Sequence, residues 1–331
     1  MPKMWKINAK AKTEINTGFG SNAADYGGRF VNKSGNPNIE KRGVNFIERI
    51  SWYHSMLALP RIKFLFLILS FYVIVNLIFA LIYYAAGVEH LIGIKGDNNL
   101  EKFGQAFFFS AQTLTTVGYG HISPSGFLVS SIAALEALTG LLSLALATGL
   151  LYGRFSKPTA YIKFSGSAII APFKNSIALM IRLAPFKNTT LTDAEAKITL
   201  GIPVEENGKI INRFFPLELE YTKVNALTLS WTLVHPINEL SPLYNLVKSD
   251  YENLDGEILV FFKAFDDMFS NIVVARSSYT FKEVFFGAKF NPMYHKNEEA
   301  NKTVLDLGKI NSFEIISLPD KEILPGNNAD L

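Results

Sequence analysis

The sequence predicts an α + β chain in which two membrane-spanning helices, with a re-entrant pore helix between them, precede a cytoplasmic β-sandwich domain. Two long apolar runs lie within residues 62–153, and a third run between them is too short to cross a bilayer. After residue 157 the chain consists of short runs rich in β-branched and aromatic residues, separated by turn residues. Many short strands with regular turns are typical of a β-sandwich.

The overall composition limits the possible classes of function. The chain has 331 residues, enough for two domains, and a formal net charge of +3, too small to indicate a nucleic-acid-binding protein. It contains no cysteine. This excludes disulfides, thiolate metal sites and cysteine catalysis, and it fits a soluble part in a reducing compartment. Residues 1–20 include lysines but no apolar segment, so no cleaved export signal is expected.

Residues 1–60 contain two different patterns. Residues 1–45 are rich in Gly, Asn and Lys without a steady period, so we predict a mobile cytoplasmic tail. Over residues 46–60, apolar residues recur every three or four positions, which predicts a short amphipathic helix. Its place directly before a membrane span favours a position at the membrane surface. A soluble helix packed on the following domain is the alternative.

The two spans are predicted at about residues 62–86 and 127–153. Phe64 to Ala86 contains no Asp, Glu, Lys or Arg. At ~1.5 Å rise per residue this run reaches about 34 Å, which is enough to cross a hydrocarbon core of ~30 Å with some tilt. Phe127 to Tyr152 is the second run, and Glu136 is its only formal charge.

The segment between the spans predicts a re-entrant element. Its apolar run, residues 103–115, can enter the membrane but cannot cross it, and non-helical backbone at that depth is tolerated only where protein or a water-filled cavity surrounds it. We therefore predict a pore helix followed by a loop. Cations flank the spans on one side: Arg49, Arg61 and Lys63 before the first, and Arg154, Lys157 and Lys163 after the second. The positive-inside rule then places both termini in the cytoplasm.

Residues 158–317 predict the β-sandwich. Candidate strands cover residues 167–183, 195–203, 226–234, 257–262 and 272–279, with turns at 206–209 and 254–256 among the segments between them. The tail over residues 318–331 contains two prolines and several Asn and Asp residues, so it is expected to be disordered.

Residues 116–120 read TVGYG, the established sequence of the potassium selectivity filter. A dehydrated potassium ion needs rings of oxygens in place of its water, and four copies of one strand can supply them around an axis. Gly118 and Gly120 can adopt backbone angles closed to other residues, which lets successive carbonyls face the same way. Thr116 can add a hydroxyl ring, and Tyr119 can brace the strand against the preceding helix.

The filter sequence predicts a homotetrameric, potassium-selective channel. One chain supplies two spans and one re-entrant loop, which is too little to enclose an ion, so four chains are expected around the axis. The expected ligand is a potassium ion coordinated by Thr116, Val117, Gly118 and Tyr119, with Gly120 completing the filter. The half-helix before the filter directs the negative end of its dipole toward the central cavity.

Residues around the filter and in the soluble part resemble the prokaryotic inward-rectifier potassium channel family. In the membrane part they are Phe107 to Ser110, Gln112-Thr113, Leu135 to Leu138, Gly140, Arg154-Phe155 and Lys157-Pro158. In the soluble part they are His235 to Ile237, Ser241 to Tyr244 and Ala275 to Tyr279. The resemblance runs from about Arg42 to Leu307. It implies an immunoglobulin-like β-sandwich, a four-fold cytoplasmic vestibule, no voltage-sensor helix, and a place in the bacterial inner membrane.

The resemblance also implies a cytoplasmic part of the ion pathway. Residues 264–270 match the loop that narrows the cytoplasmic pore, so the candidate lining residues are Lys263, Ala264, Phe265, Asp267 and Met268. Strong rectifiers of the family carry an Asp at the position of Leu144 and a Glu at the position of Lys263, whereas Asp267 matches another acidic position. We therefore expect weak rectification.

Candidate gate residues lie on the second span. Leu144, Thr148 and Tyr152 are spaced by four residues and share a helical face, so they could form rings that close by dewetting. A place for Tyr152 in the lipid-facing aromatic belt is the alternative. Gly140 and Gly149 could act as hinges, and close helix packing explains them equally well.

A basic cluster is expected at the cytoplasmic leaflet. Arg61, Lys63, Arg154 and Lys157 flank the two spans and are candidates for binding anionic lipid head groups, including phosphoinositides. The alternative is plain anchoring under the positive-inside rule. Whether such lipids activate or inhibit the channel is left open.

Two polar residues in the membrane part have open roles. We interpret Glu136 as hydrogen-bonded behind the filter, with a pore ligand as the alternative. His121 follows the filter where many potassium channels carry Asp, which leaves the electrostatics of the outer mouth open.

Two other classes of function fit the sequence less well. A membrane-anchored enzyme is the first, but the histidines, His54, His90, His121, His235 and His295, form no metal pair at helical spacing, and no Walker or Rossmann glycine motif is present. The second is a non-conducting lipid or ligand sensor on the same fold. The intact filter argues against it, because nothing else requires that sequence.

Overall fold

A computed structural model of the chain describes residues 8, 10, 11, 13, 29–43, 45, 51–206, 209–244, 246–297 and 301–318. The chain divides into two compact units: residues 41–157 form one, and residues 1–40 together with 158–331 form the other. Most of the expected tail over residues 1–28, the start of the expected surface helix at 46–50, part of the turn at 206–209 and the end of the chain from 319 onward lie outside the described residues.

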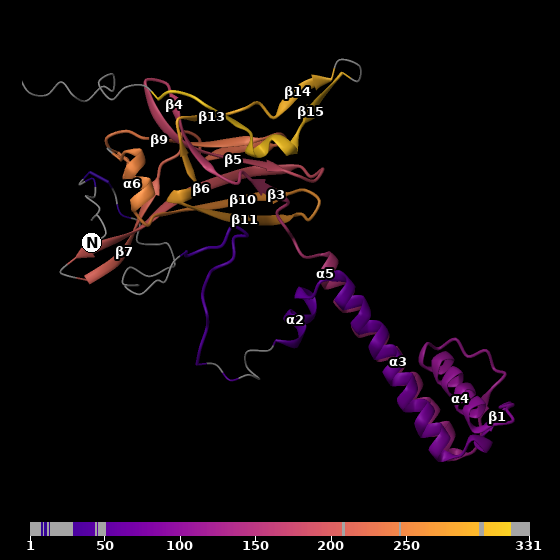
Figure 1. Ribbon diagram of the computed structural model, residues 1–331. Coiled ribbons are helices and arrows are strands. Elements are labelled where there is room, and N and C mark those ends of the chain that lie inside the picture. The colour runs from indigo at the N-terminus through magenta and orange to yellow at the C-terminus, as the bar shows by residue number, and fades with distance from the viewer. Residues whose placement is uncertain are drawn as a thin grey trace, which may run out of the picture. The chain divides into compact units, whose positions relative to one another are not determined.

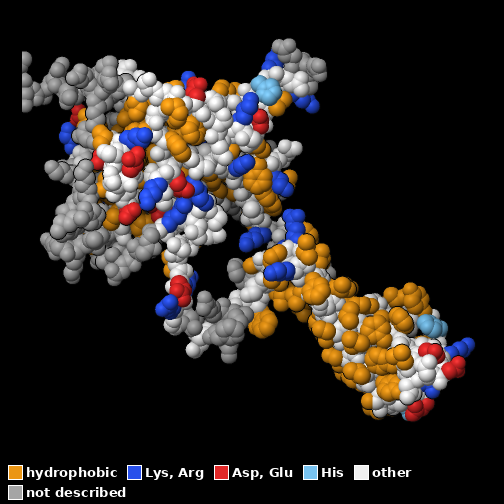
Figure 2. Space-filling model, viewed as in Figure 1, with side chains coloured by type: hydrophobic (Ala, Val, Ile, Leu, Met, Phe, Trp, Pro, Cys, Tyr) orange, Lys and Arg blue, Asp and Glu red, His pale blue; other side chains and the backbone are white. Residues whose placement is uncertain are grey.

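The unit of residues 41–157 is helical (Figure 1). Its helices are α2 (Trp52–Ala58), α3 (Arg61–Ala86), α4 (Asn99–Leu114) and α5 (Phe127–Phe155), and a short ladder joins β1 (Leu91–Ile92) to β2 (Ser123–Pro124). Helices α3 and α5 are each long and apolar enough to cross a membrane. Hydrophobic side chains cover their visible surface (Figure 2), as expected of helices that face lipid or a neighbouring subunit.

Helix α4 begins four residues before the expected pore helix. The Asn98 side chain accepts a hydrogen bond from the backbone N–H of Glu101 at 2.8 Å, and the Glu101 carboxylate accepts one from the backbone N–H of Asp97 at 3.0 Å. These bonds satisfy N–H groups that have no partner within a helix. The polar cap extends the helix beyond its apolar run, and hydropathy alone does not detect it.

The three long helices enclose a small core. Tyr83 of α3 stacks edge-to-face on Phe109 of α4, with 5.2 Å between ring centroids. Phe79, Ala106 and Val129 complete the contact among α3, α4 and α5. The short pore helix is therefore held against both long helices of its own chain.

The second unit is a sandwich of two five-stranded sheets, drawn as stacked layers in Figure 1. One sheet contains β6 (Leu191–Glu206), β7 (Lys209–Leu217), β8 (Lys223–Leu227), β10 (Glu257–Asp266) and β11 (Asn271–Thr280). The other contains β3 (Ile162–Phe164), β4 (Ala168–Phe173), β5 (Ser176–Pro185), β9 (Trp231–Pro236) and β12 (Val284–Phe286). Alternate residues such as Ile181, Leu200 and Phe262 fill the space between the sheets.

Shorter elements surround the sandwich. The pairs β13 (Ala288–Phe290) with β16 (Phe313–Ile315) and β14 (Tyr294–Asn297) with β15 (Lys302–Leu305) form two small ladders, and α6 (Lys248–Asn253) precedes β10. The described residues also include 3₁₀ helices at Val88–His90, Phe281–Glu283 and Leu307–Asn311.

Two of the expected strands were wrong as single strands. The run over residues 167–183 is the hairpin β4–β5, which turns at Lys174 with a φ of +52°. The run over residues 226–234 is divided between β8 and β9, which belong to opposite sheets. The first break falls at Lys174-Asn175-Ser176, a short polar signal between two apolar strands, and the second falls at Thr228 to Ser230, where the turn signal is weaker.

A segment near the N-terminus, residues 29–38, is bound to the sandwich. The buried Glu257 carboxylate accepts hydrogen bonds from the backbone N–H groups of Phe30 at 2.5 Å and Val31 at 3.1 Å. Arg29 donates to the carbonyl of Ser278 at 2.5 Å and to Glu283 at 3.2 Å. We call this segment the N-terminal strap; it is an ordered part of the region that the sequence predicted to be mobile.

Candidate functional site

The TVGYG segment has an alternating backbone. Thr116, Gly118 and Gly120 have φ angles of +59°, +55° and +82°, while the residues between them do not have positive φ. Alternation between left-handed and ordinary conformations turns successive carbonyls toward the same side of the strand, as the filter requires. The two glycines were expected in this role; Thr116 is a non-glycine residue in the same strained conformation.

The last turn of α4 holds this segment through Gln112. Its backbone carbonyl accepts hydrogen bonds from the N–H groups of Val117 at 2.9 Å and Gly118 at 3.3 Å. Its side-chain oxygen accepts a third from the N–H of Tyr119 at 3.1 Å. These donors point back toward α4, which leaves the carbonyls free to face the opposite side.

Tyr119 differs from expectation within one chain. Its side chain is 78% exposed, so it does not brace the filter against the helix that precedes it. The three hydrogen bonds to Gln112 do this instead. An exposed aromatic ring at this place is open to contact with another copy of the chain.

A buried polar network lies on the far side of α4. Glu136 of α5 is fully buried and accepts hydrogen bonds from the hydroxyl of Tyr83 at 2.6 Å and from the hydroxyl of Ser110. The Ser110 hydroxyl lies 3.0 Å from the side-chain oxygen of Asn76. The network joins α3, α4 and α5 where unpaired polar groups would be costly. The carboxylate is therefore directed at helices of its own chain.

The two glycines of α5 have different surroundings. A Cβ added at Gly140 would fall 1.9 Å from the backbone oxygen of Leu114, so the end of α4 approaches α5 where only glycine fits. A Cβ at Gly149 would meet nothing within 4 Å. Close helix packing within one chain therefore accounts for Gly140 and does not account for Gly149.

The candidate gate residues share an exposed face of α5. Leu144 is 65% exposed and Tyr152 is 74% exposed, and Thr148 between them is exposed as well. The face is available to line a cavity or to contact another chain.

Arg154 has a structural role that the sequence did not indicate. Its guanidinium donates to the carbonyl oxygens of Met56 at 3.4 Å and of Leu59, and it lies over the Phe64 ring at 4.9 Å. It thereby joins the end of α5 to the end of α2 and the start of α3, and supplies donors to carbonyls that a helix end leaves without partners. The other three members of the expected basic cluster, Arg61, Lys63 and Lys157, are exposed.

The expected cytoplasmic loop is shorter than predicted. Strand β10 continues to Asp266, and Ala264 is 2% exposed with its side chain in the sandwich core, so its place among the pore-lining side chains was wrong. Strand alternation explains this, because Phe265 and Lys263 face the other side. Asp266 closes the turn by accepting the N–H groups of Met268 at 2.9 Å and of Phe269 at 3.3 Å.

Two exposed residues, Asp267 and Met268, occupy the tip of the same turn. The ammonium group of Lys263 lies 2.9 Å from the carboxylate of Glu195 in β6. The sequence alone does not single out Glu195, because Lys263 is far away in the chain and meets it only through sheet pairing.

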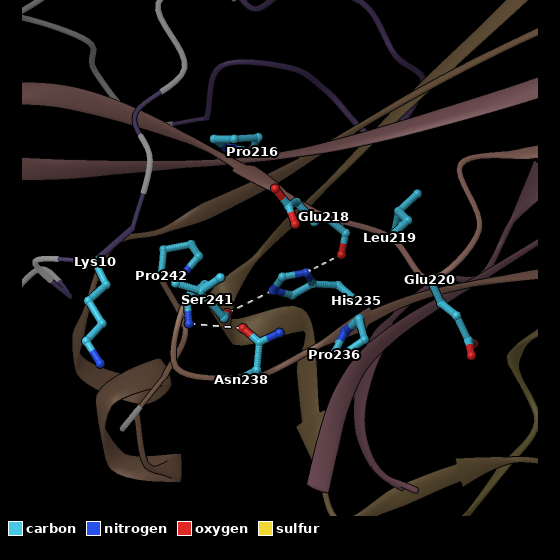
Figure 3. Close-up of a pocket in the computed structure, with 11 residues that line it drawn as sticks. Lys10, Pro216, Glu218, Leu219, Glu220, His235, Pro236, Asn238, Ser241 and Pro242 are labelled. Carbon is cyan, nitrogen blue, oxygen red and sulfur yellow. Dashed lines mark hydrogen bonds between the residues drawn. The ribbon is translucent and has the colours of Figure 1, made fainter. Parts of the chain in front are cut away.

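A pocket of about 180 Å³ in the sandwich contains His235 (Figure 3). One ring nitrogen donates to the carbonyl of Glu218 at 2.6 Å, and the other accepts from the hydroxyl of Ser241 at 2.8 Å. Ser241 in turn accepts the N–H of Leu243 at 3.1 Å. Burial lowers the pKa of His235 to about 4. The ring is neutral and fully paired, so His235 is a structural residue.

No group of three or more His, Cys, Asp or Glu side chains suited to a metal ion occurs within the part of the chain that the structure describes. Backbone carbonyls and a threonine hydroxyl, which residues 116–120 contain, are hard oxygen donors of the kind suited to an alkali cation.

Comparison with known proteins agrees with this geometry. Residues 162–328 match the family model described as "Inward rectifier potassium channel C-terminal domain", and residues 68–157 match the model described as "Ion channel". The chain is 34% identical over 286 residues to inward rectifier potassium channel Kirbac3.1 of Paramagnetospirillum magnetotacticum, an alignment that covers 85% of this chain and 94% of the relative. It is 26% identical over 339 residues to ATP-sensitive inward rectifier potassium channel 12 of Gallus gallus, an alignment that covers 91% of this chain and 77% of the relative.

These matches span both units, the two apolar helices and the β-sandwich alike, and they confirm the fold class expected from the sequence. The relatives are channels and not enzymes, in agreement with the lack of a catalytic constellation in the sequence. The chain belongs to the inward-rectifier potassium channel family.

Proposed function

We propose that four copies of the chain surround one potassium pathway and that residues 116–120 of each line its narrowest part. Potassium would be coordinated by the carbonyls of Thr116, Val117, Gly118 and Tyr119, and by the Thr116 hydroxyl. The observation that carries this proposal is the alternating backbone of the segment, whose N–H groups are bound by Gln112 on the α4 side. A homotetramer also gives the exposed Tyr119 ring a neighbouring chain to contact.

Ion flux from liposomes tests this proposal. The purified protein should pass potassium in preference to sodium, and barium, similar in size to potassium but doubly charged, should block it. Gly118→Glu should abolish flux while the protein still assembles as a tetramer in native mass spectrometry. Gly104→Ala is a matched control, because Gly104 lies in α4 with nothing within 4 Å of an added Cβ. Equal sodium and potassium flux, or an active monomer, would contradict the proposal.

The gate is proposed on the exposed face of α5. Rings of Leu144 and Tyr152, with Thr148 between them, would close the pathway by excluding water. What supports this is the exposure of all three side chains on one helical face. Leu144→Ala and Tyr152→Ala should each raise resting flux; unchanged flux in both would move the gate elsewhere.

Anionic lipids are proposed to act through cations at the cytoplasmic leaflet, in a bacterial inner membrane with both chain termini in the cytoplasm. Each cation there is worth about 1 kcal/mol toward an anionic surface. Arg61, Lys63 and Lys157 have exposed side chains suited to this role, whereas Arg154 is partly committed to helix-end carbonyls. Neutralising Arg61 and Lys157 together should reduce the dependence of flux on anionic lipid. Unchanged dependence would leave these residues as anchors.

Weak rectification is proposed because the residues expected along the potassium pathway offer little negative charge to a blocking cation. Leu144 offers no negative charge to a polycation, and Lys263 adds a positive one. The turn that carries Phe265, Asp267 and Met268 would narrow the pathway below the membrane. Current–voltage recording in bilayers with cytoplasmic spermine should show shallow block in the parent and steep block in Leu144→Asp. Steep block already present in the parent would refute the proposal.

A further inference from the structure

Four charged side chains gather on the outward face of the sheet that contains β6, β8 and β10. Cross-strand pairing places Glu195 of β6 directly opposite Lys263 of β10 on one side and Lys223 of β8 on the other. Lys197 lies two residues along β6, on the same face. The carboxylate of Glu195 is 2.9 Å from Lys263, 3.7 Å from Lys197 and 3.9 Å from Lys223.

The three lysines differ in how closely they hold the carboxylate. Lys263 is within hydrogen-bonding distance and its side chain is 43% exposed, whereas the side chains of Lys197 and Lys223 are 69% and 71% exposed. The Glu195 side chain itself is only 15% exposed. The Lys263 ammonium group beside it lowers the pKa of the Glu195 carboxyl. Glu195 is therefore an ionised acid that is largely covered, with Lys263 as its principal partner.

The direction of these side chains follows from strand alternation. Ala194, Ala196 and Ala264 point into the sandwich core, so Glu195 and Lys263 point away from it. Since Lys263 is proposed to line the cytoplasmic pathway, Glu195 must face that pathway too. This step rests on the proposed function.

We propose that Lys263 is a built-in countercharge for Glu195, and that the pair determines how weakly cytoplasmic polyvalent cations block this channel. A polycation is held in such a pathway by unpaired carboxylates. Here an ammonium group of the protein already occupies the place that an ammonium group of the blocker would take. One carboxylate and three lysines leave a net charge of +2 in this cluster. Glu195 is thus a latent cation site that the chain's own lysine fills.

Spermine block of the tetramer in planar bilayers tests this directly. In Lys263→Met, which keeps the side-chain length and removes the charge, the half-blocking spermine concentration should fall several-fold, because Glu195 loses its closest partner and keeps only the two more exposed lysines at 3.7 Å and 3.9 Å. Adding Glu195→Gln to that variant should return block to the parent level. Glu195→Gln alone should change block little, since this acid is already paired.

Matched controls separate the pair from a general loss of positive charge. Lys223→Met removes an equal charge from the same face, but at 3.9 Å from Glu195, and should sensitise the channel much less. An equal effect of Lys223→Met and Lys263→Met, persistent block in the double variant, or no sensitisation by Lys263→Met would each overturn the proposal. So would a clear loss of block in Glu195→Gln alone.

A second measurement keeps this inference separate from the proposed function. Barium-sensitive potassium current in the parent tests conduction itself. Spermine binding to the purified tetramer by isothermal titration calorimetry needs no conduction, and it should be weak in the parent, stronger in Lys263→Met and weak again in the double variant. If current is absent but spermine binding follows this order, the proposed function fails and the countercharge stands. If current is present but spermine binding does not follow this order, the proposed function stands and the countercharge fails.

Discussion

Replacing Glu257 by alanine should release the N-terminal strap from the sandwich. The Glu257 side chain is 5% exposed and accepts hydrogen bonds from the backbone N–H groups of Phe30 and Val31. The Arg29 guanidinium also forms an ion pair with the Glu257 carboxylate at 3.9 Å. A hydrogen bond to a charged group contributes about 1.5–3 kcal/mol, so loss of two should weaken binding of the strap by at least about 3 kcal/mol. Each 1.4 kcal/mol is tenfold in an equilibrium constant, so exchange of the strap's amides should quicken by roughly a hundredfold.

Hydrogen exchange followed by mass spectrometry on the full-length protein in detergent measures this effect locally, in peptides that cover residues 29–40. Glu257→Gln keeps one acceptor oxygen and should give an intermediate rate. Glu252→Ala removes the same kind of side chain from an exposed position on α6 and should leave the strap unchanged. Parent-like exchange of the strap in Glu257→Ala would refute the reasoning, because it would mean that Glu257 does not hold the segment.

Three further outcomes are expected. Because the pKa of His235 is about 4 in the folded protein, against 6.5 for an unperturbed histidine, the unfolded chain binds more protons between these values. Thermal stability should therefore fall as pH drops from about 6.5 toward 4, by up to about 1.4 kcal/mol per pH unit, and His235→Gln should flatten that slope; an unchanged slope would argue against it. Gly140→Ala places a Cβ 1.9 Å from a backbone oxygen of α4 and should cost about 1–3 kcal/mol and reduce potassium flux, whereas Gly149→Ala should be tolerated; equal effects would contradict the packing argument. Tyr83→Phe removes a hydroxyl donor from buried Glu136 and should lower the stability of the folded protein by about 1–3 kcal/mol in thermal melts, and parent-like melting would refute that role.

The membrane part of the fold could be predicted because its signals are local. A charge-free run long enough to cross a bilayer is visible without any knowledge of tertiary contacts, and α3 begins and ends within one residue of the expected first span. The candidate filter could be located for the same reason, since its five residues are contiguous, and its role in binding potassium stays a prediction. The start of α4 was missed although its signal, Asn98 followed three residues later by Glu101, is also local.

The sandwich was predicted as a class but not strand by strand. Apolar residues fill both strands of the β4–β5 hairpin, because both strands are buried on most sides, and only the polar residues Lys174, Asn175 and Ser176 mark the turn between them. Periodicity cannot locate a turn in such a run. Lys174 takes up a positive φ there although it is not a residue typical of turns.

Roles that depend on partners distant in sequence could not be predicted, and the cations show why. In the sequence, Arg61, Arg154 and Lys263 look alike, because each is a positive charge near a predicted span or a predicted pore loop. In the structure, Arg61 is exposed, Arg154 donates to the carbonyls at the end of α2, and Lys263 pairs with a glutamate on another strand. Neutralising each would therefore report on a different property: the proposed attraction to lipid for Arg61, the joint between α2 and α5 for Arg154, and the charge of the proposed cytoplasmic pathway for Lys263. A loss of lipid sensitivity on changing Arg154 would not by itself identify a lipid site, because the same change removes the donors that fix α2. Only a parallel loss on changing Arg61, whose side chain is exposed, would assign that sensitivity to lipid binding.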